Sequence, residues 1–396
     1  MDRRLKWLFG LLVTAVLVTD AVGYLPFLTT RQVRVNAPVE GFTYARSFLA
    51  AGDAWTPAGL PPVEIRATNI ASGEVLTFPA QRLTVKYRGV AVKELAIFQA
   101  RIDLPQDGAW KIQAFMSDPS GAQPSGLESR ARTITVQAGA SNHLFTAFGT
   151  GHRIAFVILF ALLAFVILRY RKPRGETEVR AVSFVISLVL LGGELSYHIF
   201  WVAIDGFSAS NSLMLHMCGI SVFLLPFLLF MKDSKARQWL FEICWFWGLG
   251  GAFQAFLAPD IGTHSFPELR FFTFFTSHGM LIIGPLFFAL TSGAQLVPHS
   301  LIRAAAVTLG ATALMWGVDQ LPRWIPPYEP ANYFFMGYPP PTGSIIDTFA
   351  DIFGPSPAYV IGIALMGIVL FALLYAPFPI VRAARRRAAA RGKQIY

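Results

Sequence analysis

The segment NSLMLHMCGISVFLLPFLLF, residues 211–230, is nearly all apolar and is about as long as a bilayer is thick. A helix rises about 1.5 Å per residue, so such a run can cross a hydrocarbon core of about 30 Å. The chain is 54% hydrophobic and only 14% charged, whereas soluble domains carry about 25% charged residues. Similar runs occur at 5–27, 152–170, 181–203, 238–258, 271–292, 301–318 and 357–379. The sequence therefore predicts an all-α polytopic membrane protein with eight crossings.

The net charge of +10 is concentrated in four short segments. Basic residues next to membrane helices favour the cytoplasmic side and anionic lipid, so the charge needs no nucleic-acid partner. This rule predicts that both termini are cytoplasmic and that residues 31–150 are extracytoplasmic. The first crossing is expected to be an uncleaved anchor rather than a signal peptide ending near Ala21-Val22-Gly23. The four basic segments are MDRRLK at 1–6, RYRKPRG at 169–175, MKDSKAR at 231–237 and VRAARRRAAARGK at 381–393.

Residues 31–145 have a different pattern, in which apolar and polar residues alternate over short segments rich in Val, Ile, Thr and Phe. Seven such segments, separated by turn clusters such as DPSGAQPSG at 118–126, predict an immunoglobulin-like β-sandwich. The region contains no cysteine and no cluster of metal ligands, so a structural role or a protein or glycan partner is expected. The seven predicted strands are VRVNA, VEIRATN, EVLTF, RLTVKY, AIFQARIDL, WKIQAFM and RTITV.

The chain thus divides into four parts. These are an N-terminal transmembrane anchor at 1–30, the β-sandwich at 31–145, a seven-helix core at 150–380 and a basic tail at 381–396. The long connection at 319–356 is rich in proline and aromatic residues, which predicts a cap lying on the membrane interface.

Ionisable side chains inside a membrane are costly and by default mark a functional site. Glu194 and His198 are four residues apart, so they share one helix face. His216 and Cys218 lie in the outer half of the next crossing, and His278 lies about two turns into a later one. Three helices therefore bring ionisable groups to one depth in the outer leaflet. Gln254, Asp260 and His264 are expected at the outer membrane edge, whereas His143, His152 and His299 are expected at membrane edges without a catalytic role.

A thiol is a weak nucleophile unless a base assists it. His216 and Cys218 are two residues apart and point about 200° away from each other on a helix, so the base must come from another helix. His278 and His198 are both available. Cys218 and Cys244 are expected at different depths, too far apart for a disulfide. An alternative reading of the same residues is packing, since a membrane cysteine or histidine often serves only helix–helix contact.

Five motifs resemble those of YwaF-like integral membrane proteins of bacteria over residues 152–380. The resemblance implies a multi-pass protein of the bacterial cytoplasmic membrane. Distant animal relatives of that family are acyltransferases that move fatty acyl chains between phospholipids, with a cysteine in the third core helix and a histidine in the fifth. Cys218 and His278 match those places, although Met214 stands where the family usually has proline. The motifs are GGELSYHIFW (192–201), LMLHMCGIS (213–221), FWGLGGAFQAFLAPD (246–260), FFTFFTSHGMLI (271–282) and NYFFMGYPPPTGSIID (332–347).

The favoured hypothesis is an outer-leaflet lipid acyltransferase with a Cys218 thioester, His278 as base, and His198 and Glu194 assisting. Membrane lipids are the expected acyl donor and acceptor, and no cofactor or metal is expected. One alternative is a zinc hydrolase using His198, His216 and His278 with Glu194 or Cys218. Another is a seven-helix receptor without enzymatic activity. Substrate contacts are predicted for His216, Gln254, Asp260, Trp201, Asn332 and Tyr333.

Overall fold

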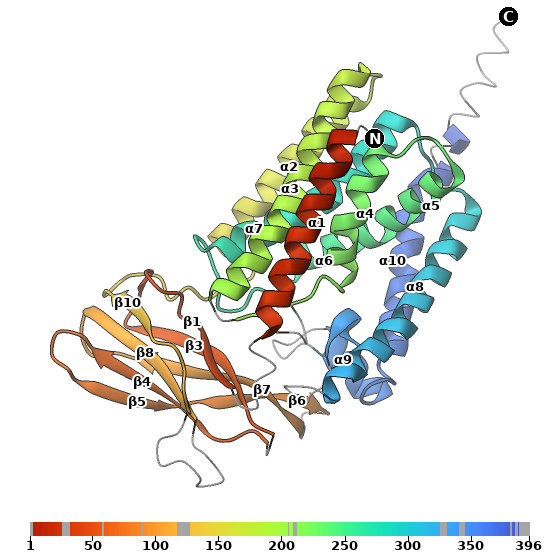
Figure 1. Cartoon of the computed structure of the whole chain (residues 1–396). Coiled ribbons are helices and arrows are strands. Elements are labelled where there is room, and N and C mark those ends of the chain that lie inside the picture. The colour runs from red at the N-terminus through yellow and green to blue at the C-terminus, as the bar shows by residue number, and fades with distance from the viewer. Residues whose placement is uncertain are drawn as a thin grey trace, which may run out of the picture.

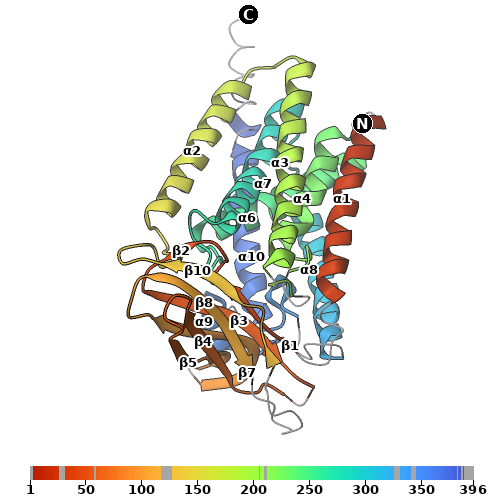
Figure 2. The same ribbon diagram turned by 60° about the vertical axis from the view of Figure 1, so that its left-hand side comes forward.

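The computed structural model describes residues 3–25, 32–57, 59–88, 90–116, 127–204, 206–208, 212–324, 331–339, 345–380, 382–384 and 387. It consists of a helical bundle and a β-rich part, here called the β-domain, which lies against one end of the bundle (Figure 1). The start of the first helix and the end of the last lie at the opposite end (Figure 2). Of the predicted features, the turn at 118–126 and most of the basic tail at 381–396 lie outside the described residues.

The bundle is built from the predicted apolar runs. Among the described residues, seven helices are long and apolar enough to cross a membrane, and an eighth apolar helix is shorter. The run near 238–258 is a continuous helix that widens to a π-helix in its middle, and a short additional helix lies in the predicted cap. The elements are α1 (Arg3–Tyr24), α2 (Thr150–Tyr170), α3 (Glu176–Ala203), α4 (Met217–Phe230), α5 (Lys235–Ile243), η2 (Cys244–Leu249), α6 (Gly250–Leu257), α7 (Leu269–Ser292), α8 (Pro298–Gln320), α9 (Ile345–Phe353) and α10 (Val360–Tyr375).

The shorter helix is α4, which corrects the prediction that the apolar run within residues 211–230 forms a full crossing. It has 14 residues, which span only about 21 Å at 1.5 Å per residue. The preceding residues fold back closely on the first turn, because a Cβ atom at Gly219 would lie 2.8 Å from the carbonyl oxygen of Met214. The helix therefore starts at Met217, inside the segment that was expected to be helical throughout.

The β-domain contains two sheets, and all neighbouring strands are antiparallel except β2 and β10. One sheet has the order β1-β3-β7-β6, and the other has the order β2-β10-β8-β4-β5, with β9 paired to β8. Trp110, Phe98 and Ile112 are fully buried in its hydrophobic core. The strands are β1 (Gln32–Ala37), β2 (Thr43–Tyr44), β3 (Ser47–Trp55), β4 (Val63–Asn69), β5 (Val75–Pro79), β6 (Gln81–Tyr87), β7 (Val90–Asp103), β8 (Gly108–Met116), β9 (Leu127–Glu128) and β10 (Arg132–Val136).

Sequence reasoning missed β3, which pairs with both β1 and β7. Its centre is Ala50-Ala51-Gly52, which lacks the large alternating residues that mark the other strands. Small residues are needed there, since a Cβ atom at Gly52 would lie only 1.9 Å from the carbonyl oxygen of Arg34 on β1. The β-branched pattern that identifies most strands is therefore excluded at this position by close backbone approach.

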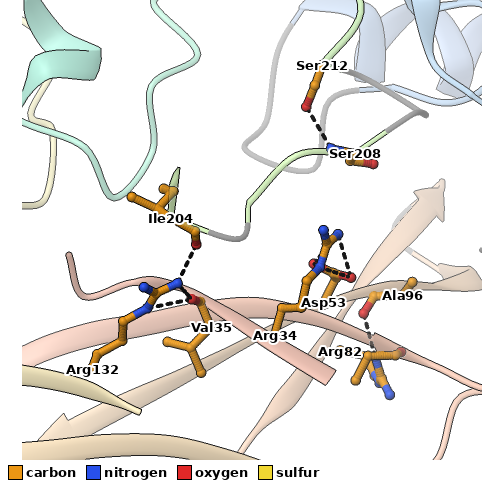
Figure 3. Close-up of polar contacts among 10 residues, drawn as sticks. Arg34, Val35, Asp53, Arg82, Ala96, Arg132, Ile204, Ser208 and Ser212 are labelled. Carbon is orange, nitrogen blue, oxygen red and sulfur yellow. Dashed lines mark hydrogen bonds and ion pairs between the residues drawn. The ribbon is translucent and has the colours of Figure 1, made fainter. Parts of the chain in front are cut away.

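Polar contacts join the β-domain to the bundle. The buried guanidinium of Arg132 on β10 donates to the carbonyl oxygens of Val35 on β1 and Ile204 at the C-terminal end of α3 (Figure 3). A cation at a helix C-terminus is favourable, because the last carbonyl groups have no partner within the helix. Arg88 directly follows β6, the edge strand of the other sheet, and its backbone N–H donates to the carboxylate of Asp351 on α9. These two hydrogen bonds lie at separate places in the contact between the β-domain and the bundle.

Candidate functional site

Cys218 is the second residue of α4, so it lies at the start of the helix rather than within it. The first N–H groups of a helix have no partner inside the helix. His216 is the N-cap residue, and its side chain makes no capping hydrogen bond. The first backbone bond of this turn runs from Ile220 N–H to the His216 carbonyl. Within the described chain, no hydrogen bond engages the N–H groups of Met217, Cys218 and Gly219.

Two glycines hold this turn close to its neighbours. Gly219 is pressed against the backbone of Met214, as noted above. On the other side, a Cβ atom at Gly251 of α6 would lie 3.2 Å from Sγ of Cys218. The thiol therefore faces the backbone of α6, and the shape of its surroundings depends on glycine at both positions.

His278 lies on α7 with its ring fixed by a local hydrogen bond. Nδ1 lies 2.8 Å from the carbonyl oxygen of Phe274, so Nδ1–H is the donor. In the neutral ring this leaves a lone pair on Nε2, which is the form required of a general base. Gly193 of α3 packs against Ser277, where a Cβ atom would lie 3.0 Å from Oγ. Gly193 and Ser277 thus form a close α3–α7 contact. Glu194 is the next residue after Gly193, and His278 is the next residue after Ser277.

The predicted Cys218–His278 dyad is not closed. Among the described residues, no hydrogen bond links Sγ of Cys218 to any imidazole. Catalytic hydrogen bonds are often formed only in the substrate complex, so this geometry leaves the pair a prediction. Cys244 is fully buried in η2. Both cysteines are free thiols.

Glu194 and His198 are in contact, and a third group joins them. Nε2 of His198 lies 3.2 Å from Oε1 of Glu194. Nδ1 of the same ring forms an ion pair with Asp20 of α1. Sequence reasoning missed Asp20 because it lies in the segment treated as an anchor. An acidic residue near the end of an apolar helix was the signal that could have found it.

His216 and the predicted cap residues lie together at the β-domain end of α4. The His216 ring packs edge-on against Tyr333, with ring centroids 5.2 Å apart. The Tyr333 hydroxyl accepts a hydrogen bond from Leu213 N–H at 3.2 Å. Oδ1 of Asn332 accepts from the N–H groups of Gly337 and Tyr338, so its side chain orders the cap. Burial raises the pKa of Tyr333 well above its ordinary value, and the hydrogen bond from Leu213 opposes this.

Asp319, at the end of α8, was also missed. Its Oδ1 accepts from Tyr333 N–H at 3.1 Å, and its backbone carbonyl accepts from Ala331 N–H at 2.9 Å. The carboxylate is completely buried. Asp319 therefore fixes the turn that carries Asn332 and Tyr333 over the start of α4.

The other predicted substrate contacts are spread over the β-domain end of the bundle. Gln254 donates to the carbonyl of Gly250 on its own helix, at 3.4 Å, and Asp260 is exposed. Trp201 packs edge-on against His264, with ring centroids 5.3 Å apart. Trp201 thus lies at the β-domain contact rather than beside the thiol.

His264 belongs to a second polar cluster, centred on the fully buried Glu268. Glu268 Oε2 lies 2.7 Å from Nδ1 of His264, and Oε1 lies 3.1 Å from Nδ1 of His143 and 3.4 Å from the hydroxyl of Tyr44. Burial alone would raise the pKa of Glu268, but the hydrogen bonds from the two histidines outweigh it, so the pKa lies below its ordinary value. Burial likewise opposes charge on His143, but the Glu268 carboxylate raises its pKa overall.

This cluster joins the β-domain and the connection to α2 with the segment before α7. His143 was expected at a membrane edge, but it is buried at this junction. His152 is also buried, with Nε2 donating to the carbonyl oxygen of Phe256 at 2.7 Å. Neither residue is near Cys218 by any contact among those described.

The residues of the zinc alternative do not form a ligand set. Both ring nitrogens of His198 face carboxylates, and Nδ1 of His278 faces a carbonyl. In the part of the chain that is described, no three His, Cys, Asp or Glu side chains are grouped to hold a metal ion. The predicted three-histidine site is therefore not assembled in this arrangement.

Comparison with known proteins identifies the helical core. The model of the TMEM164 family, a family of membrane proteins, matches residues 147–375, which is more than half of the chain. The chain belongs to the TMEM164 family. No curated protein and no solved structure matches it.

The TMEM164 match begins just before α2 and ends with α10. It includes Cys218, His278, His198 and Glu194. It excludes α1 and the β-domain, so Asp20 and His143 come from outside the region that defines the TMEM164 family.

Proposed function

We propose that the protein is an integral membrane acyltransferase that moves a fatty acyl chain between lipids through a thioester on Cys218. The observation that carries the proposal is the position of Cys218 at the uncapped start of α4. A helix N-terminus favours a thiolate, and unpaired N–H groups can receive the negative oxygen of a tetrahedral intermediate. In this proposal the N–H groups of Met217, Cys218 and Gly219 stabilise both the thiolate and the tetrahedral oxygen.

In the first half-reaction, Sγ of Cys218 attacks the carbonyl carbon of a lipid ester. Nε2 of His278 takes the thiol proton, because its Nδ1 is engaged with Phe274 and its Nε2 lone pair is available. The tetrahedral oxygen is stabilised by the backbone N–H groups. When the carbon–oxygen ester bond breaks, His278 returns the proton to the leaving oxygen, giving a lysolipid and an acyl-Cys218 thioester.

In the second half-reaction, an acceptor hydroxyl attacks the thioester. His278 takes the hydroxyl proton, the carbon–sulfur bond breaks, and the proton returns to Sγ. Because water is the competing acceptor, a site surrounded by apolar residues favours transfer over hydrolysis. Cys218 packs against the apolar core of the bundle, which fits this requirement.

Two further arguments support the proposal. The first comes from the sequence alone: the motifs around Cys218 and His278 resemble those of YwaF-like proteins, whose distant animal relatives transfer acyl chains, whereas the comparison assigns the chain to the TMEM164 family. The site also lies in the half of the bundle nearer the β-domain. By the charge of the loops this half faces the outer leaflet, which would supply the acyl donor.

The proposal is tested by mass spectrometry of the purified full-length protein and by lipid turnover in reconstituted bilayers. We expect an acyl adduct on Cys218, removed by hydroxylamine. Cys218→Ala and His278→Ala should each lower turnover at least about a hundredfold, the range of an essential nucleophile or base.

Cys244→Ala is the matched control. It removes the other thiol of the chain, and it should keep near-normal turnover at a packing cost of about 1 kcal/mol. Full turnover by Cys218→Ser would contradict the thioester, since serine keeps the size but loses the easily ionised sulfur. Lipid binding without any turnover would instead favour the receptor alternative.

A further inference from the structure

The N-terminal helix α1 does more than cross the membrane, because one of its faces is buried in the bundle. Phe9, Val16 and Asp20 are buried, and their spacing of seven and four residues places them on one side of a helix. Gly23 continues this face, since a Cβ atom there would lie 2.7 Å from the Phe207 ring. The buried face of α1, which packs against α3, thus carries a carboxylate within an otherwise apolar stripe.

Asp20 contacts His198 of α3, which also contacts the carboxylate of Glu194. Its Oδ1 pairs with Nδ1 of His198, and Nε2 of His198 pairs with Oε1 of Glu194. The imidazole is completely buried, and both carboxylates are nearly so. A charge taken out of water is stable only when it is paired, so the three groups depend on one another.

The arrangement fixes a charge balance. A carboxylate accepts protons in hydrogen bonds, so two contacts to one imidazole need two protons among the three groups. Their net charge is then −1, wherever the protons lie. If the Asp20 carboxylate is lost, the second proton is lost from His198 as well. The net charge is again −1, but all of it then lies on Glu194, which faces a neutral ring.

The groups around this triad include the thiol of the proposed reaction. α3, which carries Glu194, packs against α4, whose second residue is Cys218, and Glu194 is the triad carboxylate that acts electrostatically on this thiol. Tyr197 interacts electrostatically with both carboxylates of the triad, and Tyr333 interacts with Asp20. Arg270 lies over the Tyr197 ring, 4.7 Å from its centroid.

We infer that Asp20 is a positioning residue of the site: it holds the His198 imidazolium against Glu194 and so compensates the charge of the Glu194 carboxylate. This inference deepens the proposed function, and its catalytic meaning rests on it. It also assigns α1, which lies outside the family match, to the working part of the molecule.

The test measures the reactivity of the Cys218 thiol without any acyl substrate. The full-length protein carries Cys244→Ala, so that Cys218 is the single cysteine, and is treated with the small membrane-permeant reagent N-ethylmaleimide. Mass spectrometry gives the rate of modification at a series of pH values. In Asp20→Asn, the rate at neutral pH should fall about tenfold, because an uncompensated carboxylate opposes the thiolate. Asp20→Glu should restore most of the rate.

Val16→Ala is the matched control, because it removes buried packing from the same face of α1 and leaves the carboxylate in place. Its modification rate should equal that of the unaltered protein. An unchanged rate in Asp20→Asn, or an equal loss in Val16→Ala, would overturn the inference. If the modification rate falls only in Asp20→Asn but no acyl adduct is found on Cys218, the role of Asp20 is supported and the proposed acyl transfer is contradicted.

Discussion

At the scale of single residues, the two cysteines differ in their backbone position more than in their burial. The N–H of Cys244 is bonded to the carbonyls of Leu240 and Phe241, because the chain passes through it from α5 without a break. The N–H of Cys218 has no such partner among the described residues, because α4 has only just begun. A sulfur at a helix start is assisted by the helix, whereas one in mid-helix is not.

Gly219 is the residue on which the start of α4 depends. Gly219→Ala would place a Cβ atom 2.8 Å from the Met214 carbonyl oxygen, so the turn before Cys218 must move. We expect a loss of about 2 kcal/mol in the free energy of unfolding, as for other overpacked sites. Acyl turnover per folded molecule should also fall, because the backbone N–H groups move with the turn. Thermal melting and lipid turnover in the same detergent would measure the two effects.

Gly192→Ala on α3 is the control for this substitution. A Cβ atom at Gly192 meets no heavy atom within 4 Å, so stability should stay the same or rise slightly. Equal behaviour of the two variants would show that the close contact at Gly219 does not position the nucleophile.

At the scale of structural elements, the junction of the β-domain with the bundle depends on charge at Glu268 and His143. The pKa of Glu268 lies below its ordinary value of 4.5. Its contribution is therefore present above about pH 4.5 and is lost as the pH falls through the lowered pKa. The pKa of His143 lies above its ordinary value of 6.5. Its contribution is present below about pH 6.5 and is lost as the pH rises through the raised pKa.

The junction should consequently be most stable between these two limits. Hydrogen–deuterium exchange of peptides covering Val39–Tyr44 would measure it, because Val39 N–H donates to the Tyr44 hydroxyl, which in turn contacts Glu268. We expect the slowest exchange, corrected for intrinsic rate, at mildly acid pH, with faster exchange on both sides.

His143→Gln should remove the alkaline limb of this profile, while Glu268→Gln should flatten both limbs. His299→Gln changes an exposed histidine and should leave the profile as it is. A profile that stays unchanged in Glu268→Gln would mean that the junction is held by apolar contact alone.

At the scale of the whole molecule, the basic segment at 169–175 joins α2 to α3 at the end of the bundle opposite the β-domain (Figure 2). The positive-inside rule then predicts that the β-domain is extracytoplasmic. With Cys218→Ala and Cys244→Ala as background, Ser72→Cys in the β-domain should react with a membrane-impermeant maleimide in intact cells. Lys172→Cys should react only after the membrane is opened. Both positions are exposed, so the reverse pattern would invert the predicted orientation.

The sequence by itself determined the class of the molecule, because hydrophobic length and alternation are local properties. In the part of the chain that the structure describes, seven long apolar helices and a strand-rich region are present where the runs of Leu, Phe and Val and the alternating segments predicted them. The contact between Glu194 and His198 followed from helix periodicity alone. The family match covers residues 147–375, from just before α2 to the end of α10.

The tertiary structure decided the features that depend on contacts between distant residues, which hydrophobic periodicity does not encode. The start of α4 at Met217 depends on the close approach of Gly219 to Met214, and β3 depends on the approach of Gly52 to Arg34. Asp20 and Glu268 gained their meaning from partners 178 and 125 residues away, His198 and His143 (198−20 and 268−143). A buried carboxylate is stable only beside its partner, and a single sequence does not say which distant side chain that partner is.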